Sequence, residues 1–172
     1  MKRSRKSYDA PRRPWDKERI IDEKKISREY GLRRKKEIWR AQSILRNFRK
    51  QARLLAANVD KDRERILIDK LIRMGILSGE ATLDSILALK IEDVLNRRLQ
   101  TIVMKRGLAN TPKQARQFIV HGHILIDGRK TTWPSALVVK ELESKIGFKK
   151  NSNVHEWLKE EKANGKTKST KK

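Results

Sequence analysis

The stretch from Arg97 to Phe148 decides the fold: RRLQTIVMKRGLANTPKQARQFIVHGHILIDGRKTTWPSALVVKELESKIGF. Its opening part, together with the residues just before it, carries apolar side chains every three or four positions, which predicts a helix with one apolar face. Gly107 follows two cations, a pattern typical of a helix end, because glycine adopts positive φ and cations favour the negative end of the helix dipole. The apolar positions of this predicted helix are Val94, Leu95, Leu99, Ile102 and Val103.

A second helix is predicted after Gly107. Thr111 is a good N-cap, Pro112 suits the first helical position, and Gln114 can complete a capping box. Gly122 is placed to end this helix. We expect it to bury Ala115, Phe118 and Ile119 and to expose Lys113, Arg116 and Gln117.

Beyond Gly122 the pattern changes to that of a β-hairpin. Residues 124–126 are apolar and suited to a strand, Asp127-Gly128 suits a type I′ turn, and residues 129–131 can return as the second strand. The whole stretch therefore predicts a small module of two helices and a hairpin, with cations at most exposed turns. A module of this kind is suited to lie on a phosphate backbone.

Residues 98–129 follow the pattern R-L-x-x-x-V-x-x-x-G-x-A-x-T-x-x-x-A-R-Q-x-I-x-H-x-H-I-x-I-x-G-R. This pattern resembles the small RNA-binding domain first described in the S4 family of small-subunit ribosomal proteins. The resemblance implies that Trp133-Pro134-Ser135 and a strand at Val138-Val139 complete the domain. Pseudouridine synthases, some aminoacyl-tRNA synthetases and heat-shock proteins carry the same domain, so this part of the chain leaves the function open.

Segments outside the module favour the ribosomal family. The runs PRRPW at 11–15, EYGLR at 29–33, EIWRAQ at 37–42 and IEDVL at 91–95 are similar to archaeal and eukaryotic members of the S4 family, and we expect an archaeal one. The resemblance covers roughly residues 8–148. Trp133 departs from it, because the family more often has a branched aliphatic residue before this proline, and the tail after Phe148 does not align.

The formal net charge is +23 on 172 residues, and the charge is unevenly distributed. Residues 1–56 hold 20 basic and 7 acidic groups, residues 57–91 hold 6 of each, residues 92–148 hold 10 and 5, and residues 149–172 hold 8 and 3. A solvated surface does not require such an excess of one sign. The excess predicts a polyanionic partner that meets mainly the N-terminal third and the C-terminal module.

Upstream of the module the spacing predicts further helices. Residues 37–57 form one, in which Glu37 is the only carboxylate among nine basic groups between Arg33 and Arg53. Like charges so close together repel unless phosphates neutralise them. Residues 62–74 form another, ended by Gly75, and residues 84–89 are a short apolar connector. The apolar stripe of the long helix is Ile38, Ala41, Leu45, Phe48, Ala52 and Leu55.

The expected fold is mainly α with a small α+β RNA-binding module, in which an N-terminal helical region precedes a helix–helix–β-hairpin domain and both ends are basic tails. We expect a basic extended segment over residues 1–30, a helical ribosomal-protein domain over 31–91, the module over 92–148, and a basic, partly helical tail over 149–172. Residues 1–19 lack periodicity and are expected to be mobile when free.

Several classes of function are not expected. Cysteine is absent, so neither disulfides nor a cysteine zinc site can form. His121 and His123 alternate on an extended segment, but no third ligand lies nearby, so we expect no metal. No catalytic constellation or nucleotide-binding loop is visible, so we expect neither an enzyme nor a cofactor. No apolar run is long enough to span a membrane, and the basic N-terminus is not a secretory signal, which favours an intracellular, cytoplasmic protein.

The resemblance implies a structural constituent of the small ribosomal subunit. It implies binding to the 5′ domain of small-subunit ribosomal RNA, an early role in assembly, a bearing on translational accuracy, and contacts with neighbouring ribosomal proteins rather than with a second copy of the chain. An RNA-processing enzyme subunit or an RNA chaperone that uses the same module stays open, as does a basic DNA-compacting protein.

The candidate RNA-binding residues are mostly cations on the predicted polar faces and turns, where they can neutralise phosphates. They are Arg12, Arg13, Arg33, Arg34, Lys35, Arg40, Arg46, Arg49, Lys50, Arg53, Arg97, Arg98, Lys105, Lys113, Arg116, Gln117, His121, His123, Arg129 and Lys130.

Overall fold

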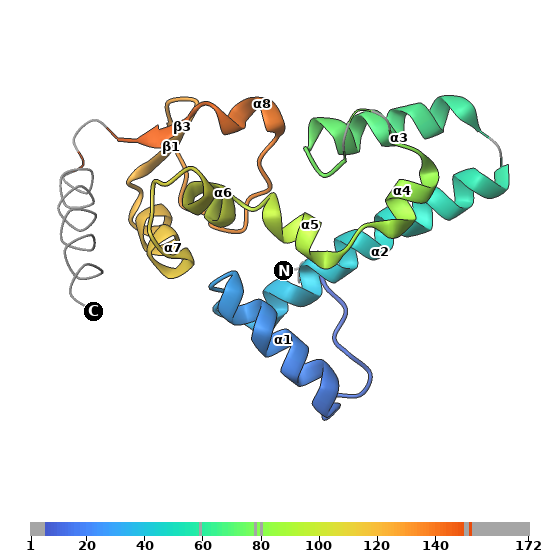
Figure 1. The fold of residues 1–172 in the computed structure, drawn as a ribbon, viewed down its shortest axis with the longest axis horizontal. Coiled ribbons are helices and arrows are strands. Elements are labelled where there is room, and N and C mark those ends of the chain that lie inside the picture. Colours follow the sequence, from blue (N-terminus) through green and yellow to red (C-terminus); the bar gives the residue numbers. More distant parts are fainter. Residues whose placement is uncertain (1–5, 59, 78, 80, 150–151, 153–172) are drawn as a thin grey trace, which may run out of the picture.

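The computed structural model describes residues 6–58, 60–77, 79, 81–149 and 152. The described chain is mainly helical, with a three-stranded antiparallel sheet near its C-terminal end, which confirms the predicted fold class (Figure 1). The elements are α1 (Lys17–Glu29), α2 (Lys35–Asn58), α3 (Lys61–Arg73), α4 (Leu83–Ala88), α5 (Ile91–Asn96), α6 (Leu99–Lys105), α7 (Pro112–His121), β1 (Ile124–Ile126), β2 (Arg129–Lys130), α8 (Lys140–Glu143) and β3 (Ile146–Phe148).

Helix α2 is the spine of the helical region. Its predicted stripe is confirmed, because five of the six stripe residues are buried and Leu55 packs against them half-buried. Leu67 and Leu71 of α3 and Ile86 of α4 join the same core. The predicted connector at residues 84–89 is thus a short helix that contributes a fully buried side chain. The buried stripe residues of α2 are Ile38, Ala41, Leu45, Phe48 and Ala52.

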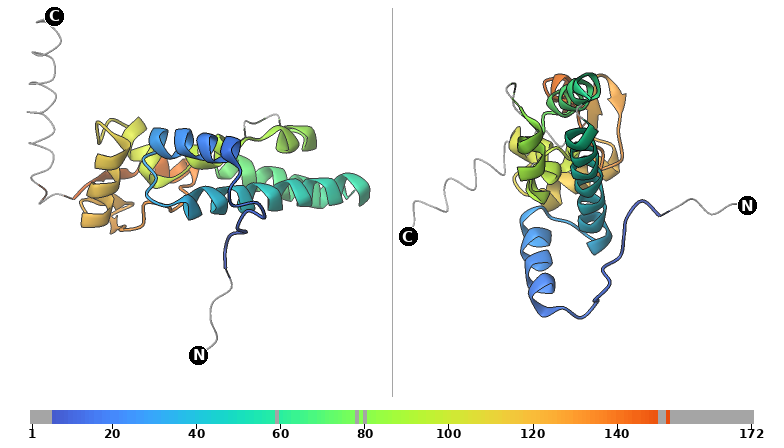
Figure 2. Two further views of the ribbon diagram at one scale, coloured as in Figure 1. Left: turned by 90° about the horizontal axis from the view of Figure 1, so that it is seen from below. Right: turned by 90° about the vertical axis from the view of Figure 1, so that its right-hand side faces the viewer.

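Helix α1 corrects the expectation of an extended segment over residues 1–30. Residues 17–29 are helical, and Figures 1 and 2 show α1 projecting from the N-terminal end of α2, away from α3 and α4. The helix is fixed by Glu23, a buried carboxylate that accepts hydrogen bonds from Arg19 and from Trp39 Nε1, the latter at 2.9 Å. The apolar periodicity of α1 is weak. A buried polar group therefore holds α1 in place, whereas an apolar face holds α2.

The helix expected around residues 94–106 is broken in two. α5 ends at Asn96 and α6 begins at Leu99, and between them Arg98 is extended with φ −72° and ψ 142°. Val94 and Leu95 therefore belong to the core of the helical region, whereas Leu99 begins the core of the module. The break turns α6 out of line with α5 and makes this pair the joint between the two parts (Figure 1).

The second helix and the hairpin of the module form as predicted. The Thr111 side chain accepts a hydrogen bond from the backbone N–H of Gln114 at 3.2 Å, and Gly122 ends α7 in the left-handed region. Asp127 and Gly128 have φ of 50° and 76°, the positive values that a type I′ turn requires. The side chains predicted to be buried on α7, at positions 115, 118 and 119, all lie in the core.

The third strand lies elsewhere than expected. Val138 and Val139 do not form a strand; Val138 is buried in the core of the module, and the preceding residue, Leu137, makes one isolated bridge with Arg98. The third strand is β3, which pairs antiparallel with β1 to give the order β2-β1-β3. The tail from residue 149 lies outside the described residues apart from Lys149 and Ser152. Within the described part of the chain, no helix combines the length and apolarity needed to cross a membrane.

Candidate nucleic-acid interface

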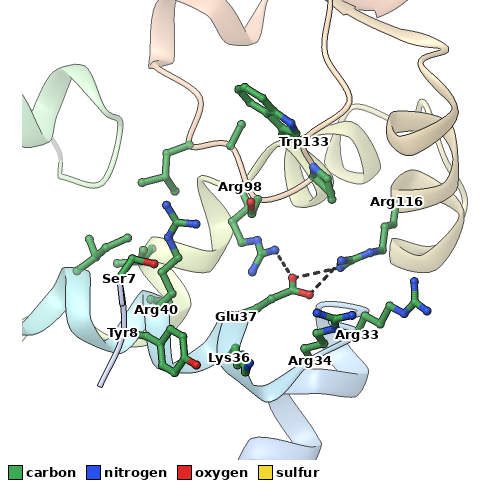
Figure 3. Close-up of a pocket in the computed structure, with 17 residues that line it drawn as sticks. Ser7, Tyr8, Arg33, Arg34, Lys36, Glu37, Arg40, Arg98, Arg116 and Trp133 are labelled. Carbon is green, nitrogen blue, oxygen red and sulfur yellow. Dashed lines mark hydrogen bonds and ion pairs between the residues drawn. The ribbon is translucent and has the colours of Figure 1, made fainter. Parts of the chain in front are cut away.

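Glu37 joins the two parts of the molecule. It sits in the first turn of α2, and its carboxylate accepts a hydrogen bond from Arg98, at the α5–α6 joint, and two from Arg116 on α7, at 3.0 and 3.1 Å (Figure 3). Arg98 is only 4% exposed. The carboxylate thus compensates two cations that come from 61 and 79 residues further along the chain.

The ion pairs decide the charge states of these groups. Burial alone would raise the pKa of Glu37, but the hydrogen bonds and positive charges of Arg116 and Arg98 outweigh it and lower that pKa below its ordinary value. Burial also lowers the pKa of the Arg98 guanidinium, and the partner carboxylate opposes this shift. A guanidinium stays protonated at any physiological pH, so both pairs are ionic.

Gln100 also holds the α5–α6 joint in place. Its side-chain amide donates hydrogen bonds to the carbonyl oxygens of Tyr30 and Gly31, both at 3.1 Å, and of Pro112, at 2.8 Å. The side chain is 1% exposed. The turn before α2, the joint and the start of α7 are therefore tied together by one amide group.

Other cations also have internal partners. Arg97 donates to Glu143 Oε2 at 3.0 Å and to the carbonyl of Val138 at 3.0 Å, so it ties the joint to the last part of the module. Arg49 is half-buried and donates to the carbonyl of Leu89. These two, with Arg98 and Arg116, stabilise the fold, so the sequence-based view of Arg98 and Arg116 as exposed groups on polar faces is corrected.

An open cleft of about 920 Å³ lies over the Glu37 pairs. One side is formed by Ser7, Tyr8 and the N-terminal end of α2, and the other by the loop 133–137 of the module, with Arg116 at one end (Figure 3). Glu37 is the only carboxylate among the residues that line it. The basic residues of the lining are Arg33, Arg34, Lys36, Arg40, Arg98 and Arg116.

The charge that the cleft offers to a ligand follows from these pairings. Glu37 is already compensated by Arg98 and Arg116. In the described part of the chain, the side chains of Arg33, Arg34 and Arg40 have no carboxylate or hydrogen-bond acceptor, and all three are exposed. Since like charges held together repel, the cleft is suited to an anion that can contact several cations at once.

The structure sorts the twenty candidates by accessibility. Arg98 is buried, and Arg49, Arg97, Arg116 and His123 are half-buried. Of the exposed ones, Lys35 pairs with Glu23 at 3.5 Å and Arg46 with Asp9 at 3.5 Å. The exposed candidates are Arg12, Arg13, Arg33, Arg34, Lys35, Arg40, Arg46, Lys50, Arg53, Lys105, Lys113, Gln117, His121, Arg129 and Lys130. Only Arg33, Arg34 and Arg40 of these line the cleft.

His121 and His123 lie near each other but have different surroundings. Their ring centroids are 6.3 Å apart; His121 is exposed, whereas His123 packs edge-on to Phe118 and its Nδ1 lies 3.1 Å from Ser152 Oγ. Among the residues that the structure describes, no group of three or more histidine, cysteine, aspartate or glutamate side chains is placed to hold a metal ion.

Sequence reasoning missed three contributors to the cleft. The Tyr8 ring packs tilted against that of Trp39, with centroids 5.9 Å apart, and the Lys36 ammonium lies over it, 5.7 Å from the ring centroid. Trp133 stands in the loop on the opposite side and is 73% exposed. Lys36 belongs to the basic run before α2 and could have been included on that ground, and the departure of Trp133 from the family pattern was the only signal for that residue.

Comparison with known proteins covers nearly the whole chain. Residues 2–96 match the family model described as ribosomal protein S4/S9 N-terminal domain, and residues 97–143 match the S4 domain. The protein named small ribosomal subunit protein uS4 from Methanococcus aeolicus is 50% identical over 155 residues, 88% of either chain. That from Methanothermobacter thermautotrophicus is 48% identical over 86% of this chain and 88% of its own length, and that from Methanosphaera stadtmanae 46% identical over 89% and 86%.

Proposed function

The chain belongs to the uS4 family of small ribosomal subunit proteins, as its resemblance predicted, and from this premise we propose that it binds the 5′ domain of small-subunit ribosomal RNA and helps to nucleate subunit assembly. It is a structural, non-enzymatic constituent of the small subunit in the cytoplasmic ribosome. An RNA-processing enzyme subunit, the alternative from another class, is not supported by this membership.

One observation carries the proposal: Arg33, Arg34 and Arg40 line the cleft, and no described residue pairs with their side chains. Their charges are held in place by the α2 N-terminal end and its flanking turn, and they face a loop of the module across the compensated Glu37. A ligand seated there contacts both parts of the protein. Folded RNA fits this requirement, because its phosphates are closely spaced and its junctions bring several helices together.

The remaining exposed cations extend this surface beyond the cleft. Lys113 precedes Arg116 on α7 and Gln117 follows it, and Arg129 and Lys130 form the strand after the hairpin turn. These side chains give the module a second set of phosphate contacts, so the cleft and module together fix the orientation of the RNA. We further propose that neighbouring small-subunit proteins contact the chain, that it acts as a single copy, and that its placement bears on translational accuracy.

The test is binding of the full chain to a transcript of the 5′ domain of small-subunit ribosomal RNA. A transcript of the same length and composition in scrambled order is the matched control, since it carries the same charge without the fold. We expect tighter binding to the folded transcript at every salt concentration. Equal affinity for both transcripts, or for double-stranded DNA of equal charge, would contradict shape-selective ribosomal RNA binding and favour a nonspecific basic protein.

A further inference from the structure

Trp133 has an exposed aromatic face that the fold does not use. Its side chain is 73% exposed, and it has neither a ring contact nor a side-chain hydrogen bond with any described residue. The other aromatic residue of the cleft, Tyr8, is already packed against Trp39 and covered by Lys36. Because the indole is exposed to water, the folded protein does not gain the free energy of burying this large apolar surface. A ligand that covers the exposed face can gain that free energy.

The loop that carries Trp133 is held in place. The backbone N–H of Leu99 donates to the carbonyl of Ala136 at 2.8 Å, the N–H of Gln100 donates to the carbonyl of Pro134 at 3.3 Å, and the N–H of Ala136 donates to the carbonyl of Trp133 at 3.2 Å. These bonds fasten the loop to the first turn of α6. An aromatic platform on a fastened loop loses little conformational freedom when a ligand stacks on it.

The charge opposite the indole is positive. Figure 3 shows Trp133 on one side of the cleft and Arg33, Arg34 and Lys36 on the other, with Glu37 between them. Because Arg98 and Arg116 already compensate Glu37, this carboxylate does not repel an anion as a free one would. The cleft therefore combines a flat π surface with guanidinium groups that no described residue pairs, across a space that is within the usual size of small-ligand pockets.

We propose that this cleft holds an unpaired nucleotide of bound RNA, with its base stacked on the indole of Trp133 and its flanking phosphates on Arg33, Arg34 and Arg40. The inference rests on the proposed RNA-binding function and adds a ligand and a site to it. A nucleotide inside a regular duplex is stacked on both faces and offers none to the indole, so the occupant is a bulged or single-stranded nucleotide. Stacking on an aromatic side chain tolerates any base.

The experiment uses the full chain and a hexaadenylate RNA as the probe, with affinity read by fluorescence anisotropy of a label on the RNA. We expect Trp133→Val to weaken binding by about fivefold to a hundredfold, the range that loss of one base–aromatic stack produces. Trp133→Phe keeps a π face and should lose less. Ile66→Ala is the control, because it removes exposed apolar surface from α3, whose residues do not line the cleft.

Two further measurements identify stacking as the cause. The slope of log affinity against log salt should be the same for the wild type and Trp133→Val, since no phosphate contact is removed. A hexamer of abasic ribose phosphates should bind the wild type no better than it binds the valine variant. Circular dichroism of each variant shows whether the fold is retained, and Trp133→Phe keeps the test decisive if the valine variant loses structure.

The outcomes separate this inference from the proposed function. If the wild type binds the ribosomal 5′-domain transcript and hexaadenylate, and Trp133→Val binds the hexamer within twofold of wild type, the stacking site is refuted and the RNA-binding function stands. If the wild type binds neither RNA, both fail. Hexaglutamate peptide provides a further test. If Trp133→Val weakens its binding as much as it weakens binding of the RNA hexamer, the assignment is overturned, because the occupant would then be an acidic peptide.

Discussion

The carboxylate of Glu37 on α2 accepts two hydrogen bonds from the guanidinium of Arg116 on α7, at 3.0 and 3.1 Å, although 79 residues of chain separate them. Arg98 donates to the same carboxylate. One acidic side chain therefore holds the helical region and the module together, and it is the acid that stands among the nine cations between Arg33 and Arg53. Its main partners are not those neighbours but two arginines from the other part of the molecule.

Glu37→Gln is expected to destabilise the protein by about 3 kcal/mol, the low end of the range for removing one member of a buried ion pair, because Glu37 is only partly buried. The substitution leaves the nearly buried Arg98 without a counter-charge. Urea unfolding followed by circular dichroism measures the change. Glu29→Gln, at the exposed end of α1, is the matched control and should alter stability little; an equal loss in both variants would mean that the Arg pairs are not the cause.

The lowered pKa of Glu37 makes its contribution dependent on pH. A carboxyl whose pKa is lower in the folded than in the unfolded state contributes fully above its ordinary pKa and loses that contribution as pH falls through the folded value. The stability difference between the wild type and Glu37→Gln should therefore be constant above about pH 5 and shrink as the pH falls further. Urea titrations from neutral to acid pH test this, and a difference that stays constant across the whole range would contradict it.

Gln100→Ala is expected to cost about 2–3 kcal/mol, because it leaves buried carbonyl oxygens without a donor and opens a small cavity. The carbonyls that lose this donor belong to Tyr30 and Gly31, whereas the carbonyl of Pro112 keeps its place in the hydrogen bonding of α7. Thermal unfolding measures the loss. Gln117→Ala, on the exposed face of α7, removes the same amide group from solvent-exposed surface and should change stability by only a few tenths of a kcal/mol.

The exposed cleft arginines and the paired ones should respond differently to substitution. Arg40→Ala is expected to weaken binding to the 5′-domain transcript by roughly 1–3 kcal/mol, to lower the salt slope by about one, and to leave stability unchanged. Arg116→Ala is expected to reduce stability first, because its partner is Glu37. Nitrocellulose filter binding over a salt series measures the affinities, and urea unfolding measures the stabilities.

Arg65→Ala supplies the control for these two variants, since Arg65 is exposed on α3, whose residues do not line the cleft. It should leave both affinity and stability near wild type. For the wild type we expect affinity to fall about a thousandfold or more between about 50 and 200 mM salt if 6–10 phosphates are contacted. An affinity that does not change with salt concentration would contradict the proposal that phosphate contacts dominate RNA binding.

Local signals in the sequence predicted those elements whose causes are local. The capped start of α7, its glycine end and the Asp127–Gly128 turn depend on residues within a few positions of one another, so they could be recognised without a structure. The apolar stripe of α2 is likewise a property of one helix. The break at Arg98 could not be found in this way, because the extended residue is held by a bridge to Leu137 and an ion pair with Glu37.

The same limit applies to the candidate site. The sequence shows where the cations are but not which of them carboxylates from distant segments compensate. Arg98 and Arg40 look alike in the sequence, yet one is buried against Glu37 and the other is exposed in the cleft. Helix α1 was missed for a related reason: its stability depends on the burial of Glu23 against Trp39 and Arg19, and a buried carboxylate leaves no apolar periodicity to detect.

The N-terminal segment before α1 is held near Tyr8 and Asp9 and again next to α1, where Arg19 donates hydrogen bonds to the carbonyl oxygens of Arg13 and Pro14 at 3.0 and 2.9 Å. The backbone N–H of Asp9 donates to Ser43 Oγ at 3.1 Å, and the Tyr8 ring packs against Trp39. The side chains of Arg12, Arg13 and Trp15 are exposed. In the described part of the chain, none of these contacts uses the backbone N–H of Arg12, Arg13 or Trp15, and ordering a residue costs about 1–2 kcal/mol of conformational entropy.

We therefore expect the amides of Arg12, Arg13 and Trp15 to exchange with solvent rapidly in the free protein and the amide of Asp9 more slowly. On binding the 5′-domain transcript, the three fast amides should become protected, because phosphate contacts at the arginines then offset the ordering cost. Hydrogen exchange of the free protein and the complex measures both states. Ser43→Ala, which removes the acceptor, should speed exchange at Asp9 alone. Equally fast exchange of residues 12–15 in both states would show that this segment is a solvated tail that takes no part in binding.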